Sequence, residues 1–156
     1  MSKDTKYIAF QASDDYLHCE RIRKQIEVLY LNNGKLSVTF CQRNGALRFA
    51  CISQVYDIEI FHKLGYFDNS QFGADSEYLY RFFKLINIEL ECNYKYNKGL
   101  IFLNSIGIHY CIPHKLYIIN CNDDSCLSNL IPLHSKKRIK YQKKFIEKIN
   151  KLDNLY

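Results

Sequence analysis

The stretch Lys6–Leu29, KYIAFQASDDYLHCERIRKQIEVL, decides the fold that we expect for the first part of this 156-residue chain. Its opening residues, KYIAFQ, favour a β-strand and form a run short enough for a buried strand. Ile22, Ile26 and Leu29 then recur at the i, i+4, i+7 spacing of one helical face, which predicts a helix over residues 18–31. The stretch therefore predicts a strand followed by a helix, the pattern of α/β proteins.

Two adjacent acidic residues, Asp14 and Asp15, stand where this predicted strand gives way to the helix. In open α/β sheets, ligands bind at the carboxyl ends of strands, so this is a position for a binding site. Paired carboxylates can hold a divalent cation against two phosphate oxygens, because Mg²⁺ and Mn²⁺ prefer hard oxygen ligands. The same pair could instead cap the helix and complement its dipole.

The rest of the sequence continues the α/β pattern. Two β-prone runs, KLSVTFCQ and LRFACISQV, flank an Asn44-Gly45 pair, which is typical of a β-hairpin turn. The run DIEIFHKL predicts a short helix that Gly65 ends, and another helix begins near Asp75. Beyond it, LIFLNSIGIHY and KLYIIN are predicted as two strands. The helix near Asp75 is expected to bury Tyr78, Leu79, Phe82, Phe83 and Ile86.

The composition is that of a chain able to build a hydrophobic core. Hydrophobic residues make up 47% and aromatic residues 15%, and the length fits one ordinary folded unit. No apolar run is long enough for a membrane span and no secretory signal is visible, so we expect a soluble cytoplasmic protein. Seven cysteines, an odd number without a CxxC pair, indicate thiols in a reducing compartment.

The net charge of +6 is concentrated at the end of the sequence. Residues 135–156 hold eight of the 22 basic residues but only two of the 16 acidic ones. Phe145, Ile149 and Leu152 recur there at helical spacing, which predicts a basic amphipathic helix. Its lysine face is either solvated or a peripheral contact for an anionic membrane. We find no motif for specific nucleic-acid binding.

Two acidic blocks give the sequence a resemblance to family 2 glycosyltransferases. YIAFQASDDYLHCERIRKQIEVL resembles the family's strand followed by QDSDDWxxPERLxKQ, and FHKLGYFDNSQFGADSEYLYRF resembles its FxKIGxFD…FGxDxExxxR segment. A looser third match is LYIINCNDDSCLSN…KKRIKYQKKF, similar to the family's LY, SLT-like and RxxY ending. The resemblance implies a partial GT-A-type α/β fold, a mixed sheet flanked by helices, over residues 1–134, with the basic helix over residues 135–156.

The resemblance also implies a chemistry: a sugar passes from a nucleotide-sugar donor to an acceptor hydroxyl with inversion of configuration. Asp14 and Asp15 would bind the donor and a Mn²⁺ or Mg²⁺ ion that bridges its diphosphate, and Asp75 would be the catalytic base. Glu77 would position the base or touch the acceptor, and Arg81 would touch the donor. From the residues alone, Asp75 could be a helix cap, while Glu77 and Arg81, at i and i+4, could be a helical ion pair.

Departures from the family pattern widen the range of functions. The family's nucleotide-binding strand and loop precede the first acidic block, whereas this sequence begins five residues before that block's strand. We therefore expect an N-terminal half that is missing or separately encoded, or an inactive fragment that serves as a binding or scaffold module. An uncovered strand edge would favour a homo-oligomer. Near the diphosphate, Asn120 or Asn122 stands where relatives often have Arg or His, and an amide is a poorer phosphate partner.

Two other chemistries fit the sequence less well. A zinc site could be drawn from late His and Cys residues, although their spacing matches no zinc module, and a core or surface role is the simpler interpretation. Paired carboxylates also occur in glycoside hydrolases, but adjacent acids beside a strand end favour metal and phosphate. The donor sugar and the acceptor, whether glycan, protein or lipid, stay open. The zinc candidates are His109, Cys111, His114, Cys121 and Cys126.

Overall fold

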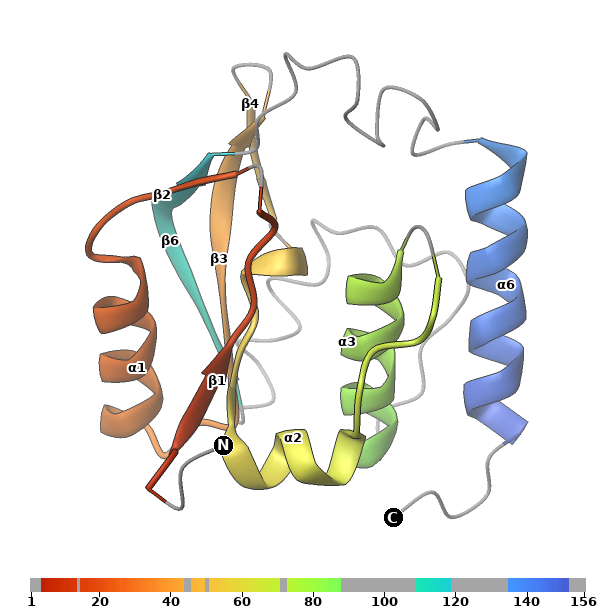
Figure 1. The fold of residues 1–156 in the computed structure, drawn as a ribbon, viewed down its shortest axis with the longest axis horizontal. Coiled ribbons are helices and arrows are strands. Elements are labelled where there is room, and N and C mark those ends of the chain that lie inside the picture. Colours follow the sequence, from red (N-terminus) through yellow and green to blue (C-terminus); the bar gives the residue numbers. More distant parts are fainter. Residues whose placement is uncertain are drawn as a thin grey trace. The chain divides into compact units, whose positions relative to one another are not determined.

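The chain is a mixed α/β protein, as predicted, and Figure 1 shows its elements in a computed structural model. Its contacts divide it into two compact units, residues 1–62 with 95–120 and residues 63–94 with 121–156, and each unit is treated by itself. The structure describes residues 4–13, 15–43, 46–49, 51–70, 73–87, 109–118 and 135–151, with only the backbone described for 42–43, 46–49 and 109–118. The described elements are β1 (Tyr7–Ala9), β2 (Tyr16–Leu17), α1 (Arg21–Leu31), β3 (Leu36–Arg43), β4 (Ala46–Phe49), η1 (Cys51–Ser53), β5 (Val55–Asp57), α2 (Ile58–Leu64), α3 (Ala74–Leu85), β6 (His109–Ile118) and α6 (Lys136–Lys151).

The first unit is built on a six-stranded mixed sheet. Its strands follow the order β1-β5-β3-β6-β2, and β4 pairs with β3 beside this path. Among the described strands, β3 and β6 pair in parallel, while every other pair is antiparallel. The long strand β3 is therefore the centre of the sheet, and β1 and β2 lie at its two ends although they are close in the sequence.

The predicted hairpin is confirmed, but its second run is not a single strand. Arg43 pairs with Ala46, which leaves Asn44-Gly45 as a two-residue connection. After β4, the 3₁₀ turn η1 interrupts the run LRFACISQV, and the chain continues as β5. Both halves pair with β3: β4 with its last four residues and β5 with its first two. The turn thus moves the chain along one edge of β3.

The strand β6 joins two runs that the sequence predicts as separate strands. Thr39 of β3 pairs with Ile112 and Phe40 with Lys115, so two residues, Pro113 among them, bulge out of the ladder. Proline has no N–H to donate, and a bulge is one of the few places where a sheet accepts it. The other residues of the two predicted runs, 100–108 and 119–120, lie outside the described residues.

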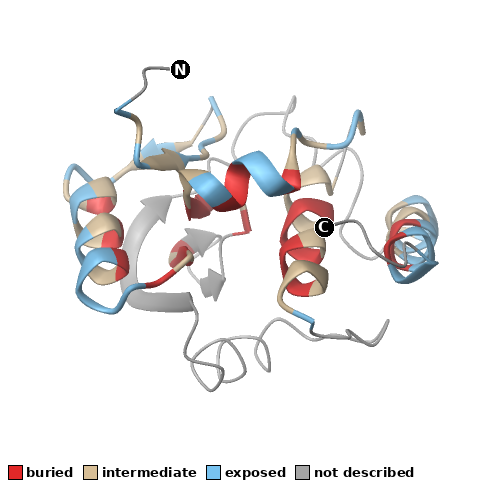
Figure 2. Cartoon of the chain, turned by 90° about the horizontal axis from the view of Figure 1, so that it is seen from below, coloured by how far each residue is buried: buried red, intermediate tan, exposed pale blue. Residues whose placement is uncertain are grey.

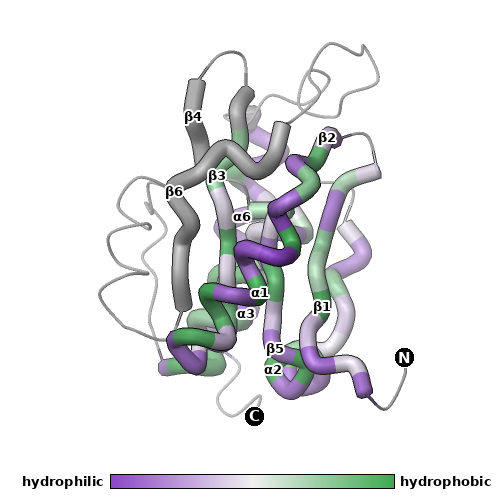
Figure 3. Tube along the Cα trace, turned by 90° about the vertical axis from the view of Figure 1, so that its left-hand side faces the viewer, coloured by the Kyte–Doolittle hydropathy of each residue, from purple (hydrophilic) through white to green (hydrophobic). Residues whose placement is uncertain are grey.

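Helix α1 packs against the sheet, contacting β3, β5 and β6, and it begins three residues later than predicted. Its buried positions are Arg21, Gln25 and Leu29, whereas Ile22 and Ile26 of the expected apolar face are only half-buried. Figure 3 shows the resulting mixture of polar and apolar positions along α1. The prediction of the helix is confirmed, and of its predicted face Leu29 is buried; Arg21 and Gln25 take the other buried positions because these polar side chains find partners inside the unit.

The second unit pairs α3 with α6. Tyr80 of α3 and Phe145 of α6 meet edge to face, with ring centroids 5.2 Å apart. Figure 2 shows the buried stripe of α6 on the side that faces α3, so the amphipathic character predicted for this helix is confirmed over Lys136–Lys151. The end of the predicted range, with Leu152, lies outside the described residues. Gly65, at φ 73°, follows the last residue of α2, as predicted. The cluster between the helices comprises Tyr80, Tyr141, Phe145, Ile146 and Ile149.

Helix α3 buries four of the five residues predicted to form its apolar face. They are Tyr78, Leu79, Phe82 and Phe83, while Ile86 is the half-buried C-cap. No helix among the described residues is both long enough and apolar enough to cross a membrane.

Candidate functional site

The first acidic block lies between β1 and β2. Asp15 directly precedes β2 and is half-buried, and its backbone N–H donates to the carbonyl of Ala12 at 3.4 Å. Asp14 lies outside the described residues. The strand before the block, β1, is antiparallel to β5, so the rule that places ligands at the ends of parallel strands does not apply to it. The segment instead connects β1 to the far end of the sheet.

Asp15 does not cap the helix that follows it. The N-cap of α1 is Glu20, and the first turn of α1 contains no acidic residue. Glu20 forms an ion pair with Arg23 on the exposed surface. The hydrogen bond from Arg23 in this pair lowers the pKa of Glu20. The interpretation of the acidic pair as a helix cap is therefore wrong for Asp15.

A buried polar network anchors Phe10, the residue just before the segment that contains the acidic pair. The guanidinium of Arg21, which is 1% exposed, donates to the carbonyl of Phe10 at 2.9 Å and to the side-chain oxygen of Gln25 at 2.8 Å. The Gln25 amide donates in turn to the carbonyls of Ser53 at 2.8 Å and Ser37 at 3.1 Å. These hydrogen bonds therefore connect α1 both to the sheet and to Phe10.

Sequence reasoning did not assign a role to Arg21 or Gln25. Both lie in the block RIRKQ, inside the segment that resembles the glycosyltransferase family, and this was the one signal that could have pointed to them. Their i, i+4 spacing placed them on one helical face, but polar residues on a helix ordinarily face water.

Asp75 lies in the first turn of α3, where its carboxylate accepts a hydrogen bond from the backbone N–H of Ser76 at 2.9 Å. The N-cap is Gly73, at φ 73°, so Asp75 is not the cap itself. Burial raises the pKa of Asp75; the amide of Ser76 and the positive charge of Arg138 oppose this rise. Asp75 is half-buried by its solvent exposure. A partly buried carboxylate with a raised pKa is a stronger base than a fully exposed one, which suits proton abstraction.

Glu77 and Arg81 form the ion pair that their spacing predicts. The Arg81 Nε lies 2.8 Å from Glu77 Oε1, and another guanidinium nitrogen donates to Oε2 at 3.0 Å. Arg81 also donates to the carbonyls of Leu64, the last residue of α2, and of Tyr66, just after that helix. Burial raises the pKa of Glu77, and Arg81 opposes that rise. This guanidinium therefore holds α3 to the preceding loop.

Helix α6 adds residues that sequence reasoning did not place at the site. The Tyr141 hydroxyl donates to Asp68 Oδ2 at 2.7 Å. A Cβ on Gly73 would lie 3.4 Å from the Tyr141 ring, so this ring packs against the N-cap of α3. Burial raises the pKa of Tyr141 to about 12. Arg138, whose charge acts on Asp75, lies one turn earlier; together they form the RxxY pair of the third, looser block.

The predicted site residues fall into two groups. Asp15 belongs to the first unit, and Asp75, Glu77 and Arg81 lie on α3 in the second, the two acids in its first turn. No cluster of three His, Cys, Asp or Glu side chains suited to a metal ion occurs among the described residues. The zinc candidates Cys121 and Cys126 lie outside those residues, as do the side chains in β6. Asn120 and Asn122 lie outside them as well.

No profile of a known protein family matches the chain. A comparison with curated proteins gives no match either.

Proposed function

We propose that this chain catalyses an inverting glycosyl transfer, with Asp75 as the general base. The observation that supports this proposal is the environment of Asp75: burial raises its pKa at the start of a helix, where backbone amides would otherwise lower it. Glu77, in the first turn of α3, is paired with Arg81, and the Tyr141 ring packs against the N-cap residue Gly73. A positioned base requires contacts of this kind around it.

The reaction is a single displacement. An Asp75 oxygen accepts the proton of the acceptor hydroxyl while that oxygen forms a bond to the anomeric carbon of the donor. The bond from this carbon to the diphosphate oxygen breaks, and the nucleoside diphosphate leaves with its electron pair. One face of the carbon is attacked as the other is vacated, so the configuration inverts.

The donor side of the proposal rests on Asp14 and Asp15. Carboxylate oxygens are suitable ligands for Mn²⁺ or Mg²⁺, and Asp15 directly precedes β2, in a segment whose first residues follow Phe10, which Arg21 anchors. A bound ion would neutralise charge that develops on the departing diphosphate. Within the chain, the two carboxylates would hold the ion and orient the donor, and Glu77 with Arg81 would position the base.

A second candidate function is a binding or scaffold module without catalysis. The engagement of Arg81 favours it, because this guanidinium bonds to Glu77 and to two backbone carbonyls and is thereby held in a structural role. A module of this kind would keep the fold and lose turnover.

Release of nucleoside diphosphate separates the two functions. The purified chain is incubated with Mn²⁺, an acceptor mixture and a panel of uridine- and guanosine-diphosphate sugars. We expect release by the wild type, none by Asp75→Asn, and unchanged release by Asp4→Asn, a control at an exposed aspartate. Asp15→Asn should lose release as well, together with metal-dependent nucleotide binding. Release that survives in Asp75→Asn would refute the role of this base.

A further inference from the structure

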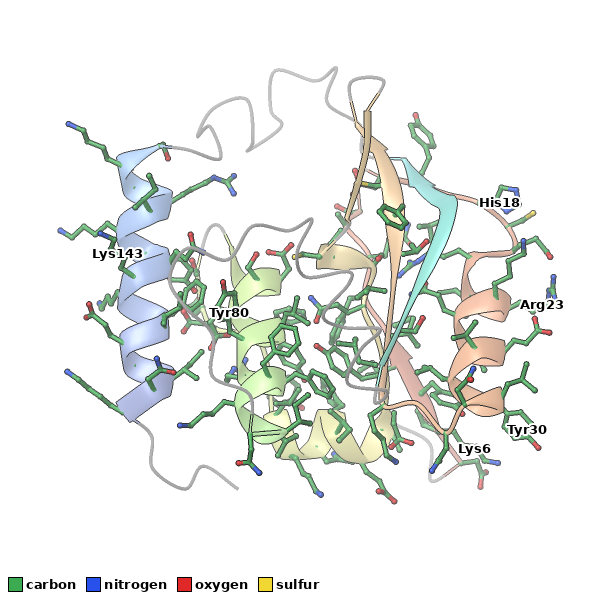
Figure 4. All side chains as sticks on the ribbon, turned by 180° about the vertical axis from the view of Figure 1, so that it is seen from behind. Lys6, His18, Arg23, Tyr30, Tyr80 and Lys143 are labelled. Atoms are coloured by element: carbon green, nitrogen blue, oxygen red, sulfur yellow. The ribbon has the colours of Figure 1, made fainter. Side chains whose placement is uncertain are left out.

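Seven of the ten exposed residues of α6 are lysines. Phe145, Ile146 and Ile149 are buried on the opposite side, so the lysine face is not needed to pack the helix. Figure 4 shows Lys143 on the side of α6 turned away from Tyr80 of α3. Glu147 is the only acidic residue within this exposed surface of α6. The lysine face comprises Lys136, Lys137, Lys140, Lys143, Lys144, Lys148 and Lys151.

The positions of these lysines are unfavourable for the stability of α6. Lys136 and Lys137 occupy the first turn, which has no acidic residue, and the helix dipole disfavours cations there. Lysines four residues apart, such as Lys140 and Lys144, repel one another. Helix stability therefore does not account for the lysine face, whereas an anionic partner would relieve both unfavourable effects.

The face also contains an apolar contact. Ile139 is 42% exposed, and it lines a shallow open hollow together with four of the lysines and Glu147. A bilayer surface offers both kinds of partner, phosphate head groups for the lysines and the acyl boundary for the isoleucine. Clusters of four to eight basic residues on an amphipathic helix are typical of binding to anionic lipid.

A nucleic acid fits this surface less well. Nucleic-acid interfaces rely on arginine forks and on aromatic rings that stack with bases. Arg138 is half-buried with its charge acting on Asp75, and the aromatic residues of α6 pack toward α3. The exposed residues of α6 are thus its seven lysines, Ile139, Glu147 and Asn150, with no arginine and no aromatic ring among them.

We propose that the lysine face of α6, with Ile139, docks the protein reversibly on an anionic lipid bilayer. The chain would then lie on the membrane surface through charge attraction, with Ile139 touching the head-group boundary. This contact needs neither a metal ion nor a nucleotide, so it stands or falls independently of the glycosyl transfer proposed above.

Co-sedimentation with vesicles tests this proposal. The wild type should sediment with vesicles of phosphatidylglycerol and phosphatidylcholine at about 50 mM salt and detach at about 500 mM, because salt screens exposed charges. It should not bind vesicles of pure phosphatidylcholine. Equal binding to both kinds of vesicle would overturn the proposal.

Matched variants locate the contact. Replacing Lys136, Lys140, Lys143 and Lys144 with glutamine should weaken binding at least tenfold, with far-ultraviolet circular dichroism unchanged. Replacing four lysines elsewhere in the chain should weaken it less than twofold, although the net charge falls by the same amount; an equal loss would overturn the proposal. Ile139→Ser should weaken binding several-fold. Tighter binding to a duplex or single-stranded nucleic acid than to the anionic vesicles would also overturn it. The control lysines are Lys6, Lys24, Lys63 and Lys84.

Discussion

The buried amide of Gln25 offers the sharpest test of how the first unit is held together. Gln25 is 0% exposed, donates to two backbone carbonyls, and accepts a hydrogen bond from Arg21. Gln25→Ala removes these three bonds at about 1 kcal/mol each, besides a longer contact of 3.5 Å to the Ser37 hydroxyl, and the lost methylene adds about 1 kcal/mol. We therefore expect the free energy of unfolding to fall by about 4 kcal/mol, a large part of the roughly 5–15 kcal/mol typical of a domain.

The control for this prediction is Glu27→Ala in the same helix. Glu27 has a side chain of similar length, 54% exposed, and its ion pair with Arg23 spans 3.3 Å. An exposed pair of this kind contributes less than about 1 kcal/mol. Urea unfolding followed by far-ultraviolet circular dichroism gives both values, and hydrogen exchange in α1 assigns them to the first unit. A cost for Gln25→Ala within about 1 kcal/mol of the Glu27→Ala value would refute the network as a source of stability.

Three further predictions concern the second unit. Burial raises the pKa of Asp75. The free energy of unfolding of the wild type should therefore fall as pH rises above 3.8. At pH 7, Asp75→Asn should have the higher melting temperature in thermal unfolding, and equal melting temperatures would contradict this. Gly73→Ala and Gly65→Ala should each cost about 1–2 kcal/mol for a left-handed backbone, but only Gly73→Ala, which meets a tyrosine ring, should also reduce turnover. Phe145→Ala should cost about 3 kcal/mol in urea unfolding and the exposed Lys144→Ala under about 0.5; similar losses would argue against the α3–α6 packing.

Local signals in the sequence predicted the described elements well. The Asn44-Gly45 pair identified the hairpin because few residues other than Asn and Gly adopt the turn that it needs. The 3.6-residue spacing of apolar side chains identified α3 and α6, with four of the five predicted residues buried in α3 and both Phe145 and Ile149 buried in α6. The turn residues and the apolar spacing involve positions close together in the sequence, so both can be recognised from a single sequence.

Features that depend on distant partners could not be predicted in the same way. The run LRFACISQV has one uniform β pattern, and its division into β4 and β5 follows from their pairing with different parts of β3. The buried face of α1 includes Arg21 and Gln25 because carbonyls from three other segments accept their hydrogen bonds. No pattern inside α1 contains that information.

The candidate site likewise has features that the sequence predicted and features that depend on distant contacts. The two acidic blocks were found by their resemblance to glycosyltransferase segments, and the Glu77–Arg81 ion pair by its i, i+4 spacing. The contacts that Tyr141 makes with Asp68 and with the N-cap of α3 join segments about seventy residues apart. The raised pKa of Asp75 likewise depends on burial in the folded unit, which a helix-start pattern does not reveal.

Calorimetric titration of a nucleoside diphosphate, with and without Mn²⁺, tests the central claim most directly. If the acidic segment before β2 is the donor site, the wild type binds the nucleotide only in the presence of Mn²⁺. Asp15→Asn should then weaken this binding at least tenfold, a loss of about 1.4 kcal/mol, while Asp4→Asn leaves it unchanged. Wild-type binding that is absent, or that Asp15→Asn leaves intact, would contradict the account.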